Sequence, residues 1–268
     1  MRNHGRVIRA VFSREFRSYL ASPTGYVFVT LFVFLSAVAA FWQERFFATN
    51  LANLDQLNRF FPYLLIFLVP AISMGLWAEE KKHGTDELLL TLPARDAELV
   101  IGKYLAALAI YTVALIFSLS HVVVLAWLGS PDRGLMVATY FGYWLMGAAL
   151  LALGMFASLL TDNLTVAFIL GAVFCAAPVF LRHAGTILSG GSQRLAERLS
   201  FVDQFQDLSS GIVTASSVVY FVSFGLAFLY LNAALLGRRR WPAGRRAPQL
   251  GKHYLVRGLA LAVMVASL

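Results

Sequence analysis

Six long stretches of the chain contain no Asp, Glu, Lys or Arg and consist mainly of apolar residues. They cover residues 18–43, 60–78, 104–131, 134–161, 163–181 and 208–237. A helix of about 20 mostly apolar residues can cross the roughly 30 Å hydrocarbon layer of a bilayer. Transmembrane β-strands need only about 9–11 residues and alternate in polarity, unlike these continuous runs. The pattern therefore predicts an all-α polytopic membrane protein with six transmembrane helices.

The segment before the first span has the periodicity of an amphipathic helix. Apolar residues share one face and basic or polar residues the other, namely Val7, Ile8, Val11, Phe12, Phe16, Tyr19 and Leu20 against Arg6, Arg9, Ser13, Arg14 and Arg17. We expect this helix to lie in the membrane interface with its arginines among the lipid phosphates, and to end at Ser22-Pro23. A signal peptide is disfavoured because the segment is long and patterned.

A second amphipathic pattern lies between spans five and six. Its apolar residues Leu195, Leu199, Val202, Phe205 and Leu208 repeat at helical spacing. Ser200 and Asp203 are placed to form a break and a cap between two short helices. The element either lies on the headgroups, dips back among the spans, or is an ordinary external loop.

The connection between spans two and three predicts a short helix outside the membrane. Four consecutive charges, residues 79–82, end the second span. Gly84 then supplies a turn, Thr85 is placed as an N-cap, and Pro93 stops a helix of about two turns. That helix would lie across the membrane axis, with leucines that lipid or a partner protein must cover, namely Leu88, Leu89 and Leu92.

Charge placement predicts the orientation of the chain. Only 13% of its 268 residues are charged, yet the formal net charge is +8. Alternate sides of the six spans collect 16 and 6 of the Lys and Arg residues, which puts the N-terminus on the cytoplasmic side. Anionic lipid is the expected neighbour of the basic tails. Nucleic-acid binding is disfavoured because those tails lack interleaved aromatic residues.

The sequence contains no pattern of an enzyme or a metal site. Gly102-Lys103-Tyr104 and Gly251-Lys252-His253 lack the hydroxyl residue of a phosphate-binding loop, and no His-Glu-x-x-His pair is present. Cys175 is the single cysteine and can form no intrachain disulfide. His121, well inside an apolar stretch, is interpreted as a hydrogen-bonded packing residue. We expect no catalytic residue, no metal and no bound cofactor.

Several segments together resemble type-2 ABC exporter permeases, the membrane subunits that pair with separate ATP-binding subunits. Residues 79–93 resemble the signature of that family, and residues 14–26 its approach to span one. Gly154 with residues 158–163 resembles its turn between spans four and five. Tyr220 with residues 238–241 resembles the branch of the gliding-motility and nitrous-oxide-reductase-maturation permeases.

The resemblance implies a function and partners. Two permease copies, here a homodimer, would form the translocation path in a bacterial inner membrane, with ATP and Mg held by the partner ATPase. An extracytoplasmic accessory subunit is a further expected partner. The residues that would couple to the ATPase are Glu79, Glu80, Lys81, Gly84, Thr85, Glu87, Leu88, Leu89 and Pro93. The alternative is a surface helix that rests on lipid.

The expected organisation has four parts. Residues 1–23 form the cytoplasmic amphipathic helix, 24–237 the six-span permease domain, 238–253 a basic cytoplasmic segment, and 254–268 an apolar segment that is either a seventh span or an interfacial helix. A secondary transporter is the main competing function, although such proteins normally carry ionisable groups inside the membrane. A membrane scaffold is a third. The apolar stretches, with Ser, Thr and Tyr as polar content, suit an amphipathic or lipid-linked cargo better than a small ion.

Overall fold

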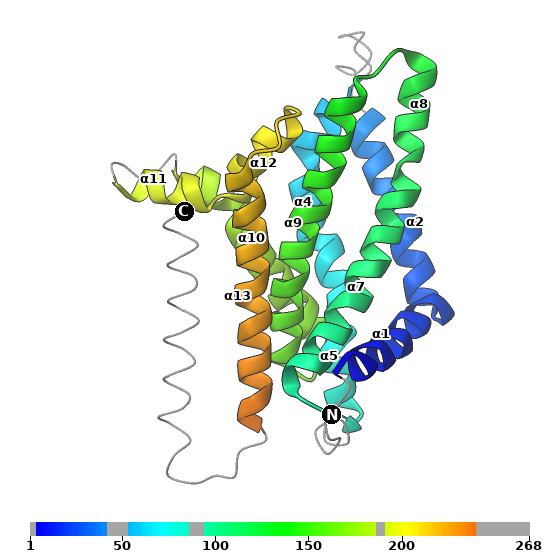
Figure 1. Cartoon of the computed structure of the whole chain (residues 1–268), viewed down its shortest axis with the longest axis vertical. Coiled ribbons are helices and arrows are strands. Elements are labelled where there is room, and N and C mark those ends of the chain that lie inside the picture. The colour runs from blue at the N-terminus through cyan, green and yellow to red at the C-terminus, as the bar shows by residue number, and fades with distance from the viewer. Residues whose placement is uncertain (1–3, 42–52, 86–93, 186–190, 240–268) are drawn as a thin grey trace.

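All regular elements in the described part of the chain are helices that run mostly side by side (Figure 1). This computed structural model describes residues 4–41, 53–85, 94–185 and 191–239. The helices are α1 (His4–Ala21), α2 (Pro23–Phe41), α4 (Asp55–Ser73), α5 (Gly75–Lys82), α7 (Asp96–Ser118), α8 (Ser120–Leu128), α9 (Arg133–Leu159), α10 (Leu164–Gly185), α11 (Gly191–Leu199), α12 (Phe201–Ser209) and α13 (Ala215–Arg239).

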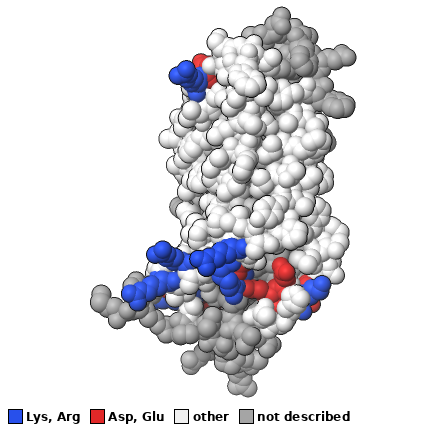
Figure 2. All heavy atoms as spheres, turned by 90° about the vertical axis from the view of Figure 1, so that its right-hand side faces the viewer, with Lys and Arg blue, Asp and Glu red and all other residues white. Residues whose placement is uncertain are grey.

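Six helical segments are long and apolar enough to cross a membrane, as the sequence predicts. They are 23–41, 55–82, 96–128, 133–159, 164–183 and 215–237. The second consists of α4 and α5, and the third of α7 and α8, with short breaks at Met74 and Leu119. Figure 2 shows charged side chains gathered at the two ends of the visible face, separated by a broad band without charge. That distribution fits a bilayer around the middle of the bundle.

Helix α9 lies at the centre of the bundle. In the most apolar part of α9, 89% of the residues are buried, whereas the corresponding share is 28% in each of α2, α10 and α13. It packs against α4, α7, α10 and α13, and small residues on several of its faces allow these helices to approach. Because these four spanning helices pack around it, we regard α9 as the central axis of the bundle.

The amphipathic N-terminal helix is confirmed. α1 lies across one end of the bundle (Figure 1) and packs against α7. Its predicted apolar residues are half-buried except Leu20, which is 42% exposed, and its described arginines are exposed. The helix ends at Ala21, and α2 begins at Pro23, as the Ser22-Pro23 pair predicts.

The element between spans five and six packs back onto the bundle at the end opposite α1. Ser200 caps α12 by accepting a hydrogen bond from the Asp203 backbone N–H at 3.3 Å, as predicted. Phe205 and Leu208 of α12 are buried against α9, where a Cβ on Gly142 would lie within 3 Å of both side chains. Of the three alternatives that the sequence leaves open, the structure therefore supports packing of α12 among the spans.

Two smaller predictions have different outcomes. His121 is buried and hydrogen-bonded, with its Nε2 2.9 Å from the Ser36 hydroxyl, so its interpretation as a packing residue is confirmed. The segments 86–93 and 240–268, which hold most of the predicted short helix and the apolar C-terminal segment, lie outside the described residues.

Candidate functional site

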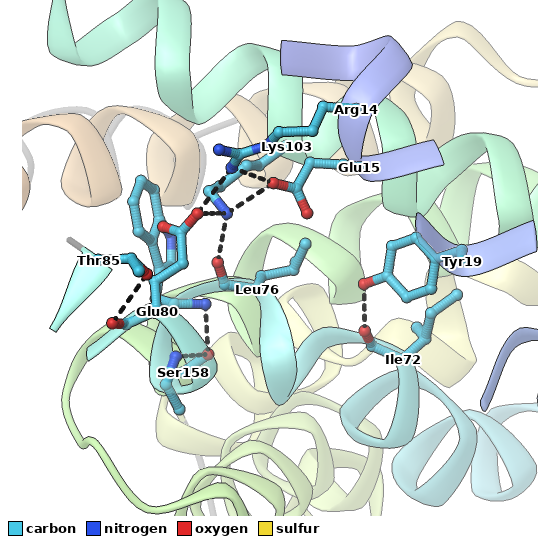
Figure 3. Close-up of polar contacts among 11 residues, drawn as sticks. Arg14, Glu15, Tyr19, Ile72, Leu76, Glu80, Thr85, Lys103 and Ser158 are labelled. Carbon is cyan, nitrogen blue, oxygen red and sulfur yellow. Dashed lines mark hydrogen bonds and ion pairs between the residues drawn. The ribbon is translucent and has the colours of Figure 1, made fainter. Parts of the chain in front are cut away.

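The second span is interrupted near the end of the bundle where α1 lies. At this point a side chain from α9 forms hydrogen bonds with backbone groups of the span. The Ser158 hydroxyl donates to the Met74 carbonyl at 2.6 Å and accepts from the backbone N–H groups of Trp77 and Ala78, each at 3.1 Å (Figure 3). In an uninterrupted helix, the Met74 carbonyl would bond directly to the Ala78 N–H. A hydroxyl inserted in this way is one of the known causes of a helix break, and it separates α5 from α4.

Helix α1 supports the same break from the other side. The Tyr19 hydroxyl donates to the Ile72 carbonyl at 2.8 Å. Burial, with added repulsion from Glu15 and Glu79, raises the pKa of Tyr19, so the hydroxyl keeps its proton and remains a donor. The interruption is thus held by side chains from two other helices, α1 and α9, and α5 is a separate helical segment at the end of the second span, before Gly84.

Four charged residues from three helices meet beside α5, and we call them the four-charge cluster: Arg14 and Glu15 of α1, Glu80 of α5 and Lys103 of α7. The Lys103 ammonium lies 3.1 Å from Glu15 Oε1 and 2.9 Å from Glu80 Oε1, and donates to the Leu76 carbonyl at 2.8 Å. Arg14 contacts the same two carboxylate oxygens at 2.5 and 2.7 Å. Figure 3 shows these groups converging between the three helices.

Lys103 is the most deeply buried member of the cluster. Its side chain is 1% exposed and lies 5.0 Å from the centre of the Trp77 ring. An unpaired ammonium would be very costly at such a position, whereas here all three N–H donors of Lys103 have acceptors. The arrangement therefore fixes α1, α5 and α7 to one another.

Electrostatic interactions within the four-charge cluster favour the ionised forms of Glu15 and Arg14. Burial by itself raises the pKa of Glu15, but attraction from Lys103 and the hydrogen bond from Arg14 outweigh burial and hold that pKa below its usual range. Burial by itself lowers the pKa of Arg14. The contacts with Glu15 and Glu80 outweigh burial and raise that pKa above its usual value. Both side chains accordingly stay ionised at neutral pH.

The four charges at 79–82 have different environments. Glu80 belongs to the cluster, and the Lys81 ammonium donates to the carbonyls of Leu159 and, at 3.5 Å, Thr161 at the end of α9. A lysine is favourable there because helix C-termini carry partial negative charge. Glu79 and Lys82 are exposed. Two of the four predicted interface charges therefore make contacts within the chain.

The turn predicted at Gly84 is present after α5, whereas the predicted N-cap role of Thr85 concerns a helix outside the described residues. Gly84 has a φ of +66°, a value that side-chain-bearing residues rarely adopt, and the Thr85 hydroxyl donates back to the Glu80 carbonyl at 3.2 Å. The other predicted coupling residues, Glu87, Leu88, Leu89 and Pro93, lie outside the described residues. The chain continues in α7, whose Glu98 side chain accepts from the Arg95 backbone N–H at 3.1 Å.

Sequence reasoning missed the cluster and the inserted serine. In the sequence, Lys103 is distinguished only as a lysine that fails the pattern of a phosphate-binding loop, and Ser158 only as part of a turn. Two signals point further. Glu15 is the single acidic residue of α1, and Lys103 falls one residue before an apolar stretch, where an unpaired charge would be costly.

Most of these contacts join one helix to another, whereas the Arg14–Glu15 pair lies within α1. A family model described as ABC-2 family transporter protein matches residues 9–264, which include all six spans and the four-charge cluster. No curated protein matches the chain. The chain therefore belongs to the ABC-2 transporter family and is a membrane-embedded permease of an ABC transporter.

Proposed function

We propose that the protein is the membrane subunit of an ATP-driven exporter and that residues 84–93 contact a separate ATPase subunit on the cytoplasmic side. The observation that carries this proposal is the connectivity of the segment. It begins where α5 ends and leads into α7, and Glu80 of α5 is paired with Lys103 of α7. A displacement of the segment would therefore move both flanking helices together.

The break at Met74 determines how α5 would respond to such a displacement. α5 is joined to α1 and α7 by the four-charge cluster, and to α9 by Ser158 and Lys81. In this proposal, a displacement of residues 84–93 would tilt α5 as a rigid body about the break. The tilt would change the contact of Ser158 with the α5 backbone. ATP-driven motion would in this way reach α9, the axis of the bundle.

In this proposal the docking surface consists of residues of the segment together with the exposed Glu79 and Lys82 of α5. Leu88 and Leu89 would insert into a groove on the ATPase, and burial of each leucine contributes roughly 1.5–3 kcal/mol. Glu79, Lys82 and Glu87 would form weaker, salt-sensitive pairs at the rim. Glu80 and Lys81 would act within the permease by holding α5.

We further propose a homodimer, because one chain carries one coupling segment and the family resemblance implies two. A secondary transporter is less well supported. The buried ammonium of Lys103 is held by three protein oxygens at one end of the bundle, whereas an ion carrier needs an ionisable group that a water-filled path can reach. A passive scaffold would keep the same contacts without responding to ATP.

The test is a Leu88→Asp/Leu89→Asp variant, purified together with its ATPase. We expect the variant to insert and fold but to release the ATPase, or to lose the dependence of ATP hydrolysis on the permease. Ala97→Asp is the matched control, since Ala97 is exposed in the first turn of α7, where an acidic residue is favourable. Copurified complexes of the unchanged protein should contain two copies of each subunit by mass. Normal ATPase binding and hydrolysis in the doubly substituted protein would refute the coupling assignment.

A further inference from the structure

A recess with several polar side chains lies at the end of the bundle opposite α1, between α4, α10 and α12. Its volume is about 470 Å³, and its polar lining includes Asn58, Arg59, Tyr63, Arg182, His183 and Gln206. Among the described lining residues there are two arginines and one histidine but no Asp or Glu. The residues of α4 and those of α10 lie far apart in the sequence and meet because these two helices pack together, and α12 closes the recess with Gln206.

The recess offers more hydrogen-bond donors than acceptors. Asn58 uses its side-chain oxygen to accept from the Tyr143 hydroxyl at 2.5 Å, which leaves its amide N–H donors for a ligand. Arg59 has no ion-pair partner within the part of the chain that the structure describes. Arg182 lies 3.5 Å from Asp203, a separation at the long end for an ion pair, and is 48% exposed. Within the described residues, the two guanidinium groups that line the recess thus have one carboxylate contact between them, that of Asp203 with Arg182.

This concentration of positive charge is unusual for the side of the membrane on which it lies. In the orientation that the charge asymmetry predicts, the outer side carries only six Lys and Arg residues, and Arg59 and Arg182 are two of them. Basic residues on that side gain nothing from the positive-inside preference. Their convergence on one recess therefore calls for a local reason, and a bound anion supplies one.

The other wall of the recess is apolar. Val202 and Phe205 line it, and the Phe205 ring is stacked on Tyr143 with ring centres 5.5 Å apart. An anionic group that carries an apolar portion would place its charge on the arginines and the remainder against these side chains. Tetrahedral oxyanions can accept hydrogen bonds from donors on three helices at once, whereas a carboxylate presents two oxygens in one plane.

We propose that this recess binds a phosphate group, contributed either by a phospholipid headgroup or by a phosphate-bearing solute. Arg59 and Arg182 pair with the phosphate oxygens from α4 and α10, and Asn58 and Gln206 add neutral donors. Asp203 competes for Arg182 and so limits the affinity. The proposal concerns binding at the outer end of the permease and does not depend on ATPase coupling through residues 84–93.

Two binding measurements on the purified full-length protein distinguish the sources of phosphate. Native mass spectrometry counts retained phosphatidylglycerol against diacylglycerol, which lacks the phosphate. Calorimetric titration with inorganic pyrophosphate measures binding of a soluble phosphate. The test variant is Arg59→Gln/Arg182→Gln. Its matched control is Arg133→Gln, because Arg133 is an exposed arginine at the same end of the bundle and lies outside the recess.

We expect the double variant to bind at least one of the two phosphate probes about tenfold more weakly or worse, while Arg133→Gln binds as the unchanged protein does. A loss confined to phosphatidylglycerol identifies a headgroup site, and a loss confined to pyrophosphate identifies a solute site. Asp203→Asn should bind severalfold more tightly, an effect that damage to the fold would not produce. Unchanged binding of both probes by the double variant, or no phosphate binding by the unchanged protein, would overturn the proposal.

Discussion

Lys103 shows how a single buried charge can join three helices in a membrane protein. Its ammonium has one carboxylate partner on α1, one on α5 and a backbone carbonyl on α5. Removing one partner from a buried ion pair is costly because the remaining charges lose their compensation. The residue is therefore a sensitive probe of whether α1, α5 and α7 act as one unit.

Replacing Lys103 by Met should destabilise the protein by up to about 3–5 kcal/mol, since Glu15 and Glu80 would lose their buried cation and keep only the exposed Arg14. Thermal unfolding in detergent measures the effect. Lys82→Met removes the same charge from an exposed position and should change stability by less than about 0.5 kcal/mol. Adding Glu15→Gln and Glu80→Gln to Lys103→Met should recover part of the loss. If Lys103→Met is as mild as Lys82→Met, the cluster does not hold the helices together.

The lowered pKa of Glu15 predicts that the four-charge cluster makes the stability of the protein depend on pH. Its pKa is lower in the folded protein than in the unfolded chain, so its contribution to stability is complete above the ordinary glutamate pKa of about 4.3 and is lost as the pH falls through the lowered value. The melting temperature of Glu15→Gln should therefore be below that of the unchanged protein at pH 7, and the difference should shrink below about pH 4.3. Exposed Glu79→Gln serves as the comparison. A gap that stays constant with pH would contradict the assignment.

At the scale of elements, the second span is two helices that a hydroxyl from α9 separates. Pro62 and Pro70 both lie within α4, and the break falls four residues after Pro70. There Ser158 replaces a backbone hydrogen bond. The position of the break therefore depends on which residue of α9 faces the backbone of the second span.

Ser158→Ala should leave the Met74 carbonyl and the N–H groups of Trp77 and Ala78 without their partner, at a cost of about 1–3 kcal/mol. Hydrogen exchange should report faster exchange of the Trp77 and Ala78 amides. Ser223→Ala is the control because the Ser223 hydroxyl donates only to carbonyls of its own helix, among them Val219 at 2.6 Å. Equal protection of both amides before and after the Ser158 substitution would show that α4 and α5 can rejoin without it.

The whole molecule has one end with the four-charge cluster and another end with the phosphate recess. The proposed orientation puts the cluster and residues 84–93 in the cytoplasm and the recess outside. α9 contacts both ends, through Ser158 beside α5 and through Tyr143, which donates to Asn58 of the recess. Both proposals share this orientation, so it needs a direct test.

Cysteine labelling in intact cells tests the orientation. In a Cys175→Ser background, a cysteine at His83 should be shielded from impermeant thiol reagents, and one at Gln193 should react, since both positions are exposed to solvent. We place this cysteine at His83 and not at the neighbouring Gly84, because the positive φ of Gly84 would strain any side chain placed there. Permeabilised cells control for reactivity, as both cysteines should then be labelled. The reversed pattern would invert the proposed topology.

The spans, the amphipathic α1, the Ser22-Pro23 break and the Ser200 cap could be predicted from sequence because each depends on neighbouring residues. Hydropathy over 20 residues, periodicity over two turns and a cap hydroxyl three residues from its N–H are local properties. The glycine turn at Gly84 is equally local. These features determined that the chain is a six-span membrane protein, and the family match agrees.

Tertiary structure alone decided which polar side chains meet. Lys103 and Glu15 are 88 residues apart, and Tyr143 and Asn58 are 85 apart, so no local pattern could join them. The sequence likewise grouped Glu80 and Lys81 with Glu79 and Lys82, but packing turned the first two inward. In an apolar bundle each buried polar group must find a partner on whichever helix lies beside it. Helix packing, and not the order of residues, selects that partner.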